Sequence, residues 1–257
     1  FRTNTDELIG HLIAVNVYQN YLPGQIHAIR AHLYKLERIN HFTKTIDLIY
    51  ESQTDQYHYH QDKTYRLSEG LTSNERYAKR PMTINQQKLE VDLYQSSFHA
   101  TTNGYFHFNQ GVDLADEKLQ YTTLTLEEKD RYQRHYEHGN VLMFKWEKFN
   151  GQFEHPDKIA ITLSFLLNEV FKSLFPHGYR YLDVTTSIPD DFGDVADPFY
   201  RRLRKYLPTI ENGNRNTDHT IYLYIFEDTP LQIGMIERIQ DKWLHILEII
   251  EDYSHCL

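Results

Sequence analysis

Alternating apolar and polar residues predict that the first half of the chain is mostly β-structure. In "KTIDLIYES", Ile46, Leu48 and Tyr50 fall on one face, as expected for a half-buried strand. The same two-residue period continues in "DQYHYHQDKTYRLSEG" and in "KLEVDLYQSSFHATT". The dipeptide Asn103-Gly104 follows, and Asn-Gly between alternating segments is typical of a two-residue hairpin loop.

Residues 24–40, "GQIHAIRAHLYKLERIN", give a mixed signal. Ile26, Ile29, Leu33 and Leu36 recur at helical spacing. The frequent His, Ile and Tyr residues and the alternating segment that follows favour strands instead. The residue pattern leaves both interpretations open.

The second half of the chain shows helical periodicity interrupted by short strands. Thr125 and Glu128 have the spacing of a capping box, which predicts that the charged segment "TLEEKDRYQRHYEHG" is a helix beginning there. The next segment, "NVLMFKWEKF", is typical of a strand. "DKIAITLSFLLNEVFKSLF" is apolar almost all round, which indicates a helix in the core.

The last part of the chain predicts a short helix, a strand and a long helix. In "DPFYRRLRKYLP", Asp197 has the role of an N-cap and Pro198 lies in the first turn. "TIYLYIF" is a strand, and a long amphipathic helix begins near Thr229-Pro230.

These patterns together predict an α+β fold in two parts. Residues 1–112 would form a mostly-β, small barrel-like accessory domain. Residues 113–257 would form an α/β part with a buried helix, a core strand and a long C-terminal helix. A chain of 257 residues is long enough for one large or two small domains.

Composition narrows the class of protein. The single cysteine excludes a disulfide framework and favours a reducing, cytoplasmic location. The sequence has no apolar run long enough for a transmembrane helix, so we expect no membrane partner. The net charge of −9 opposes strong nucleic-acid binding by the whole surface, although a local basic patch remains compatible with it. Because the sequence begins with Phe1, we expect a fragment of a longer protein.

Motifs for nucleotide chemistry and nucleophilic catalysis are missing from the sequence. It contains neither G-x-x-x-x-G-K-[ST] nor G-x-G-x-x-G, the loops that cradle phosphates, so we expect no ATP site in this chain. It also lacks the G-x-S-x-G nucleophile elbow. Cys256 is one residue from the end of the sequence, a poor place to hold a reacting thiol. We therefore expect a chain that is not itself an enzyme and holds no cofactor.

Two acidic groups are candidates for metal or catalytic sites. The first is the loop "PDDFGDVADP", with carboxylates at Asp190, Asp191, Asp194 and Asp197. Its spacing matches no EF-hand, so a solvated loop with a helix cap is the simpler interpretation. The second is Glu227 and Asp228, which follow a buried strand, where ligand sites of α/β folds often lie. We interpret these two as turn and helix-entry residues. A metal-dependent nuclease remains an alternative. It would need a Glu-x-Lys triplet on a neighbouring strand, and the sole such triplet in the sequence is Glu127 to Lys129.

Fifteen histidines raise the question of zinc. His58 and His60 would share a strand face, and His135 and His138 a helix face. Either pair supplies half of a zinc site and lacks two further ligands at recognisable spacing. If residues 103–104 form a hairpin loop, His99 opposes Phe108 and lies on the other face from His107, so those two cannot share a metal.

One basic cluster stands out, in "FYRRLRKY". With Phe199, Leu203 and Leu207 expected to face inward, the basic side chains would face out. They are Arg201, Arg202, Arg204 and Lys205, flanked by Tyr200 and Tyr206. Cationic heads with aromatic neighbours suit phosphate contacts combined with base stacking. A solvated helix face explains the same residues without a ligand. We take the six as candidate nucleic-acid-binding residues and leave both interpretations open.

The order of segments resembles the C-terminal region of superfamily 2 DNA helicases of the mitomycin-repair type. The similar segments are "LPGQIHAIRAHLYKLERIN" (22–40), "SSFHATTNGYFHF" (96–108), "LSFLLNEVFKSLFP" (163–176), "YRYLDVTTSIPDDF" (179–192) and "TIYLYIFEDTPLQIGMIERI", followed by "DYSHC". The resemblance spans most of the chain in short pieces, and it implies strands over 26–39. Where this family has four zinc-ligating cysteines, this sequence has Cys256 alone. It is either a remnant ligand, which would hold zinc only if further cysteines follow, or an ordinary residue at the chain end.

The resemblance implies a non-catalytic accessory region of an ATP-dependent DNA helicase involved in DNA repair. Its partners would be the helicase motor domains, which bind ATP, and single-stranded DNA or a partner protein. A protein-interaction module without nucleic-acid contact, for example in antiphage defence, is the alternative that the acidic balance favours. The metal-dependent nuclease is the third.

Overall fold

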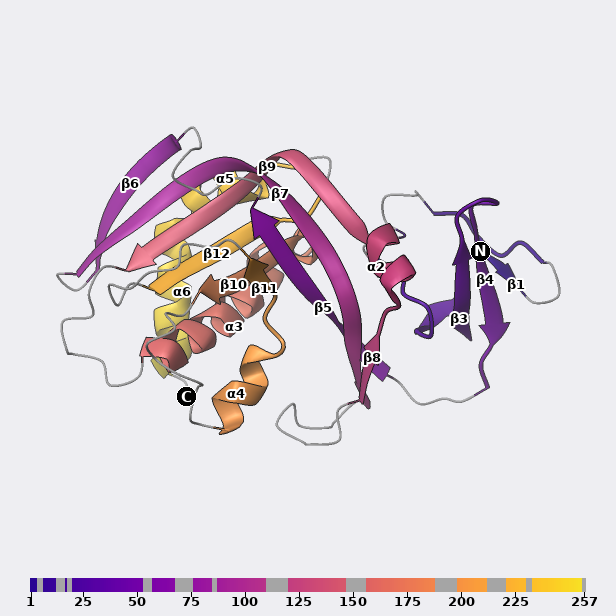
Figure 1. Ribbon diagram of the computed structural model, residues 1–257. Coiled ribbons are helices and arrows are strands. Elements are labelled where there is room, and N and C mark those ends of the chain that lie inside the picture. Colours follow the sequence, from indigo (N-terminus) through magenta and orange to yellow (C-terminus); the bar gives the residue numbers. More distant parts are fainter. Residues whose placement is uncertain are drawn as a thin grey trace. The chain divides into compact units, whose positions relative to one another are not determined.

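The computed structural model has an α+β fold, as the sequence predicts, in which strands predominate (Figure 1). It describes residues 1–3, 7–12, 17, 20–52, 57–67, 76–84, 87–109, 120–146, 156–187, 198–211, 221–229 and 233–255. The strands are β1 (Arg2–Thr3), β2 (Ile26–Ile29), β3 (His32–Asn40), β4 (Thr45–Tyr50), β5 (Tyr57–Leu67), β6 (Arg76–Ile84), β7 (Gln87–Asn109), β8 (Gln120–Thr123), β9 (Gln133–Trp146), β10 (Leu182–Ser187), β11 (Thr209–Glu211) and β12 (Ile221–Glu227). The helices are α2 (Leu126–Arg131), α3 (Pro156–Leu174), the short 3-10 helix η1 (Tyr179–Tyr181), α4 (Pro198–Arg204), α5 (Met235–Asp241) and α6 (Trp243–His255).

The described residues form two compact units. Unit 1 comprises residues 1–61 and 104–132, and unit 2 comprises residues 62–103 and 133–257. This division differs from the expected one at residues 112 and 113, because the long strands β5 and β7 each contribute to both units.

Unit 1 contains a four-stranded sheet in the order β1-β4-β3-β2. β1 pairs with β4 in parallel, and the other pairs are antiparallel. Among its described strands the sheet is open at β1 and β2, so the small barrel expected for this part of the chain is not formed by them. The strands expected over 26–39 are confirmed. Leu36, Ile46 and Leu48 are buried in its core as the period predicts, whereas Tyr50 is 58% exposed.

Unit 2 is built on a larger sheet in the order β10-β12-β9-β7-β5-β11, with β6 also pairing with β7. The pairing of β8 with residues 104–107 of β7 lies within unit 1. Helices α3, α5 and α6 lie against one face of it (Figure 1). Along β12, Leu223 and Ile225 face these helices, whereas Tyr224 and Phe226 belong to a second, aromatic cluster. The two-residue period of a strand therefore sorts its side chains between two cores.

Two helix predictions are confirmed and two are corrected. The capping box forms: the Glu128 amide donates to Thr125 Oγ1 at 3.2 Å, and the Thr125 amide donates to Glu128 Oε2 at 2.8 Å. Helix α3 matches the apolar segment, with Leu167 and Val170 fully buried. However, α2 ends at Arg131 and the polar residues after it are strand β9. The single long C-terminal helix is instead α5 and α6, separated at residue 242 and beginning at residue 235.

The Asn103-Gly104 hairpin prediction is wrong, because β7 runs straight through both residues. Gly104 pairs with Thr123 of β8, and a Cβ atom there would collide with the backbone oxygen of Thr122. Glycine is therefore needed for the close approach of two strands, and not for a turn. Asn103 donates to Thr64 Oγ1 at 2.8 Å.

Candidate functional site

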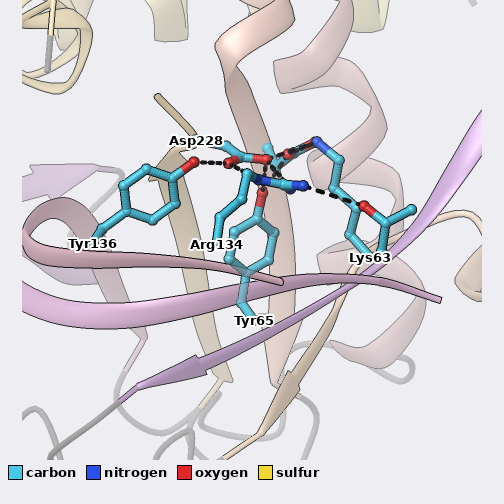
Figure 2. A network of polar contacts seen from close by, with 7 residues as sticks. Lys63, Tyr65, Arg134, Tyr136 and Asp228 are labelled. Carbon is cyan, nitrogen blue, oxygen red and sulfur yellow. Dashed lines mark hydrogen bonds and ion pairs between the residues drawn. The ribbon is translucent and has the colours of Figure 1, made fainter. Parts of the chain in front are cut away.

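A buried network of charged and phenolic side chains lies on the aromatic face of the unit 2 sheet. Figure 2 shows Lys63 and Tyr65 from β5, Arg134 and Tyr136 from β9, and Asp228 gathered around one carboxylate. Asp183 of β10 also belongs to the network. The residues come from three strands and from the end of β12, and all lie within unit 2.

Strand alternation brings these side chains to one face. On β5, Lys63, Tyr65 and Leu67 are all buried, which places the lysine in line with an apolar row. On β9, the register with β7 shifts between the pairs Ser96–Gly139 and Phe98–Tyr136. A Cβ atom on Gly139 would collide with the Phe98 ring, so this irregularity requires a glycine.

Asp228 is the centre of the network, with a side chain that is 1% exposed. Its Oδ1 accepts hydrogen bonds from Arg134 Nε at 3.0 Å and Tyr136 Oη at 2.5 Å. Its Oδ2 accepts from Arg134 Nη2 at 2.8 Å, Lys63 Nζ at 3.0 Å and Tyr65 Oη at 3.1 Å. Five donors thus occupy the two oxygens of one carboxylate.

Asp183 shares two of these donors. Its Oδ2 lies 2.6 Å from Lys63 Nζ and 2.5 Å from Tyr65 Oη, and its side chain is 23% exposed. Arg134 also reaches Thr102 Oγ1 at 3.4 Å. Two carboxylates therefore balance two cations, and the buried cluster is neutral when all four groups are ionised.

The environment moves the pKa values of Asp228, Lys63 and Tyr65 away from neutrality. Burial alone would raise the pKa of Asp228, but Lys63 and Arg134 outweigh it and lower that pKa. Burial alone would lower the pKa of Lys63, but Asp183 and Asp228 outweigh it and raise that pKa. The pKa of Tyr65 is raised by burial and by the neighbouring carboxylates.

These directions favour a structural role for the network. Catalytic acids and bases have pKa values tuned toward the working pH, whereas here the lysine and tyrosine are held protonated and the aspartate ionised. A metal ion at Asp228 would have to displace two cations from its oxygens. The network therefore acts as an electrostatic clamp on β5, β9, β10 and the end of β12.

Glu227 has a different role from its neighbour, because adjacent strand residues point to opposite faces. It is 1% exposed, and its Oε2 accepts from the amides of Met235 at 3.2 Å and Ile236 at 3.5 Å. It thus satisfies the first amides of α5, the helix-entry role expected from the sequence. Burial raises the pKa of Glu227 in spite of these backbone hydrogen bonds. For Asp228 the turn interpretation was incomplete, because it missed the clamp.

The predicted basic cluster lies on and just after α4. Arg201, Arg204 and Lys205 are exposed, and Arg202 is half-buried. Tyr206 is only 5% exposed, so it cannot stack on a base as expected. The Tyr200 ring is half-buried, and the Lys158 ammonium lies over it, 5.3 Å from the ring centroid.

The apolar side of this segment also differs in part from expectation. Leu203 and Leu207 pack in a small core with Ile161, as predicted. Phe199, expected to face inward, is instead 44% exposed. The exposed aromatic residue of this segment is therefore Phe199, and not Tyr206.

The predicted histidine pairs are not brought together as metal sites in the part of the chain that the structure describes. His58 is exposed and His60 half-buried on β5. His135 is on strand β9 instead of a helix, and its ring stacks on that of His99 with centroids 4.2 Å apart. His99 thus opposes His135 and not Phe108, while His107 contacts Gln120 at 2.6 Å.

Metal ligands do not cluster elsewhere in the described ranges either. Within them, no group of three or more His, Cys, Asp or Glu is placed to hold a metal ion. The acidic loop at 190–197, including the predicted cap Asp197, and Cys256 lie outside the described residues. No helix among those described is long and apolar enough to cross a membrane.

Comparisons with known proteins give two structural neighbours. No family model matches the sequence, and no curated protein does. Two solved structures of the DUF1998 helicase MrfA, one bound to DNA and one bound to DNA and AMPPNP, are 8% and 10% identical to the chain, with TM-scores of 0.43 and 0.38. They cover 91% and 99% of this chain, which spans about a quarter of theirs (26% and 27%). Both are of the mitomycin-repair type of helicase that the sequence resembles.

Proposed function

We propose that this chain is a non-catalytic accessory region of an ATP-dependent DNA helicase, and that α4 holds a DNA strand for the motor domains. The observation that carries the DNA contact is the exposure of Arg201, Arg204 and Lys205 on and just after α4, a segment that also exposes Phe199. Guanidinium and ammonium groups bind phosphates without regard to sequence, which suits a moving motor. The helicase parentage rests on the sequence resemblance.

The Asp228 clamp supports an accessory role over the nuclease alternative. Two-metal and one-metal nucleases need carboxylates that are open to Mg²⁺. Asp228 is instead saturated by Arg134, Lys63 and two phenols, and Lys63 also pairs with Asp183. These are contacts that hold strands together.

The test is fluorescence anisotropy with labelled single-stranded DNA across a salt series. Replacing Arg201, Arg202 and Arg204 with Ala should weaken binding and reduce the salt slope by about 0.7 for each phosphate that is no longer neutralised. A matched control replaces three cations elsewhere in unit 2, in Lys172→Ala, Arg180→Ala and Arg238→Ala, which are all exposed. The control has the same net charge and should bind like the parent.

Two results would contradict the proposal. If both triple variants bind DNA equally weakly, only the overall charge matters and α4 has no special role. If the parent does not bind DNA even at low salt, the protein-interaction module takes its place. The net charge of −9 is the observation that favours that second function.

A further inference from the structure

We infer that His32, Tyr34 and Tyr50 form a stacking platform for unpaired nucleic-acid bases on the four-stranded sheet of unit 1. The platform is in unit 1, whereas α4 is in unit 2, and the inference rests on the proposed function only in sharing its ligand, a single strand. The three rings form a triangle, with centroids 6.5, 6.1 and 6.0 Å apart and interplanar angles of 60–82°.

The platform lies on the same face of the sheet as the buried core of unit 1, next to the last buried pair of residues. Tyr34 pairs with Tyr50, and two residues along the same strands Leu36 pairs with Leu48. The two leucines are 0% and 1% exposed, whereas Tyr50 is 58% exposed. The same face thus changes from buried aliphatic to exposed aromatic side chains within one repeat of the strand.

Tyr34 is half-buried against the core, whereas the exposed rings of His32 and Tyr50 are poorly explained by the needs of the fold. A tyrosine that is mostly in water contributes little hydrophobic stabilisation, because stability follows the apolar area removed from water. Edge-to-face packing fixes the ring orientations and so reduces the entropy cost when a planar ligand stacks on them. Aromatic rings on a sheet surface bind bases without sequence preference, because every base presents a π-face.

The charge beside the platform favours a polyanion. The hairpin from Ile26 to Leu36 contains Arg30 and no acidic residue, in a chain whose net charge is −9. Lys35 is in the same hairpin but alternates to the other face, and Glu51 follows Tyr50 on the neighbouring strand, so Arg30 is the cation that the platform offers to a phosphate. Arg30 is exposed in the turn between β2 and β3, where Arg30 and Ala31 both have positive φ angles of 50° and 64°. Such a tight turn fixes the backbone, and it places the guanidinium two residues from His32.

The experiment compares two labelled strands of equal length and charge: oligo-dT and a strand of abasic sites. Loss of one stacking ring should weaken oligo-dT binding by roughly 5- to 150-fold and leave abasic binding unchanged. Tyr50→Ala is the test variant, and Tyr50→Phe should bind like the parent because it keeps the ring. Arg30→Ala should weaken both strands by the same factor.

Phe42→Ala is the matched control, because Phe42 is an exposed aromatic residue of the same unit, at 96% exposure, in the β3–β4 turn. It should bind both strands like the parent. Tyr50→Ala should keep the melting temperature of the parent, since most of its side chain is already in water.

The outcomes separate this inference from the proposed function. If Tyr50→Ala binds oligo-dT as the parent does, or if Phe42→Ala weakens binding as much as Tyr50→Ala, the platform is overturned while the α4 contact stands. If Tyr50→Ala weakens both strands equally, no base stacks there and the inference fails. If the parent binds neither strand at low salt, the platform and the α4 contact both fall.

Discussion

Replacing Asp228 with Asn should destabilise unit 2 strongly, although the two side chains have nearly the same shape. The substitution removes the negative charge that faces Lys63 and Arg134, and Asp183 alone then balances two buried cations. It also turns one of two acceptor oxygens into an amide donor that faces other donors. Breaking a buried ion pair from one side costs about 3–5 kcal/mol. That is a large share of the roughly 5–15 kcal/mol by which domains are typically stable.

Urea unfolding followed by tryptophan fluorescence measures this cost. The chain has two tryptophans, Trp146 and Trp243, and both lie in unit 2, so the signal reports on that unit alone. Glu169→Gln is the control, because that carboxylate pairs with Lys172 at the surface with a side chain that is 62% exposed. It should cost less than about 1 kcal/mol.

A compensating change tests whether charge is the cause. Adding Lys63→Met to Asp228→Asn leaves one cation, Arg134, and one carboxylate, Asp183, in the network, and should recover about 1–3 kcal/mol through coupling within it. The electrostatic reasoning is refuted if Asp228→Asn costs no more than Glu169→Gln, or if the double variant is no more stable than the single one.

The same variant should alter the dependence of stability on pH. The folded pKa of Asp228 lies below its ordinary value of 3.8, so its contribution is present above that value and is lost as pH falls toward the folded pKa. Asn cannot titrate. The difference in stability between the parent and Asp228→Asn should therefore shrink as the pH falls below about 4.

Two further predictions concern other parts of the chain. Burial lowers the pKa of His27 from 6.5 to about 4, so only the unfolded chain binds the proton between these two pH values. The free energy of unfolding of unit 1 should therefore fall by about 2–3 kcal/mol as pH falls from 6.5 to 4. Hydrogen exchange of the β2–β4 amides measures this fall, and His27→Gln should abolish it. The chain should also retain well under one zinc ion per molecule when purified without a histidine tag, since a structural zinc needs four ligands; a full equivalent in metal analysis would contradict this.

The sequence pattern correctly predicted the elements that are determined by residues close together in the chain. The Thr125 capping box and the apolar helix α3 depend on residues a few positions apart, so the sequence contains what determines them. Residues 133–139 could not be assigned in this way. Their polar composition suits a helix, but pairing with β7 makes them part of β9. Tertiary pairing decided the structure there.

The clamp was missed because its members are scattered along the sequence. One signal was available: Lys63 falls on the same face as the buried Tyr65 and Leu67, and a lysine on an apolar face needs an anionic partner. The two-residue period of the strand alone cannot identify Asp228 as that partner. The role of Gly104 was misjudged for a similar reason, since it is set by a neighbouring strand that the local sequence does not reveal.

The distance along the chain between Lys63 and Asp228 has a consequence for how the protein folds. The two residues are 165 positions apart, so the lysine is synthesised long before its partner leaves the ribosome. Until β12 docks, assembling β5 and β9 on either side of β7 would bury Lys63 and Arg134 without their central carboxylate, which opposes early compaction. Folding of unit 2 should therefore be late and slow, as is typical of topologies dominated by distant pairings. A nascent chain that ends before residue 228 should remain a substrate for chaperones.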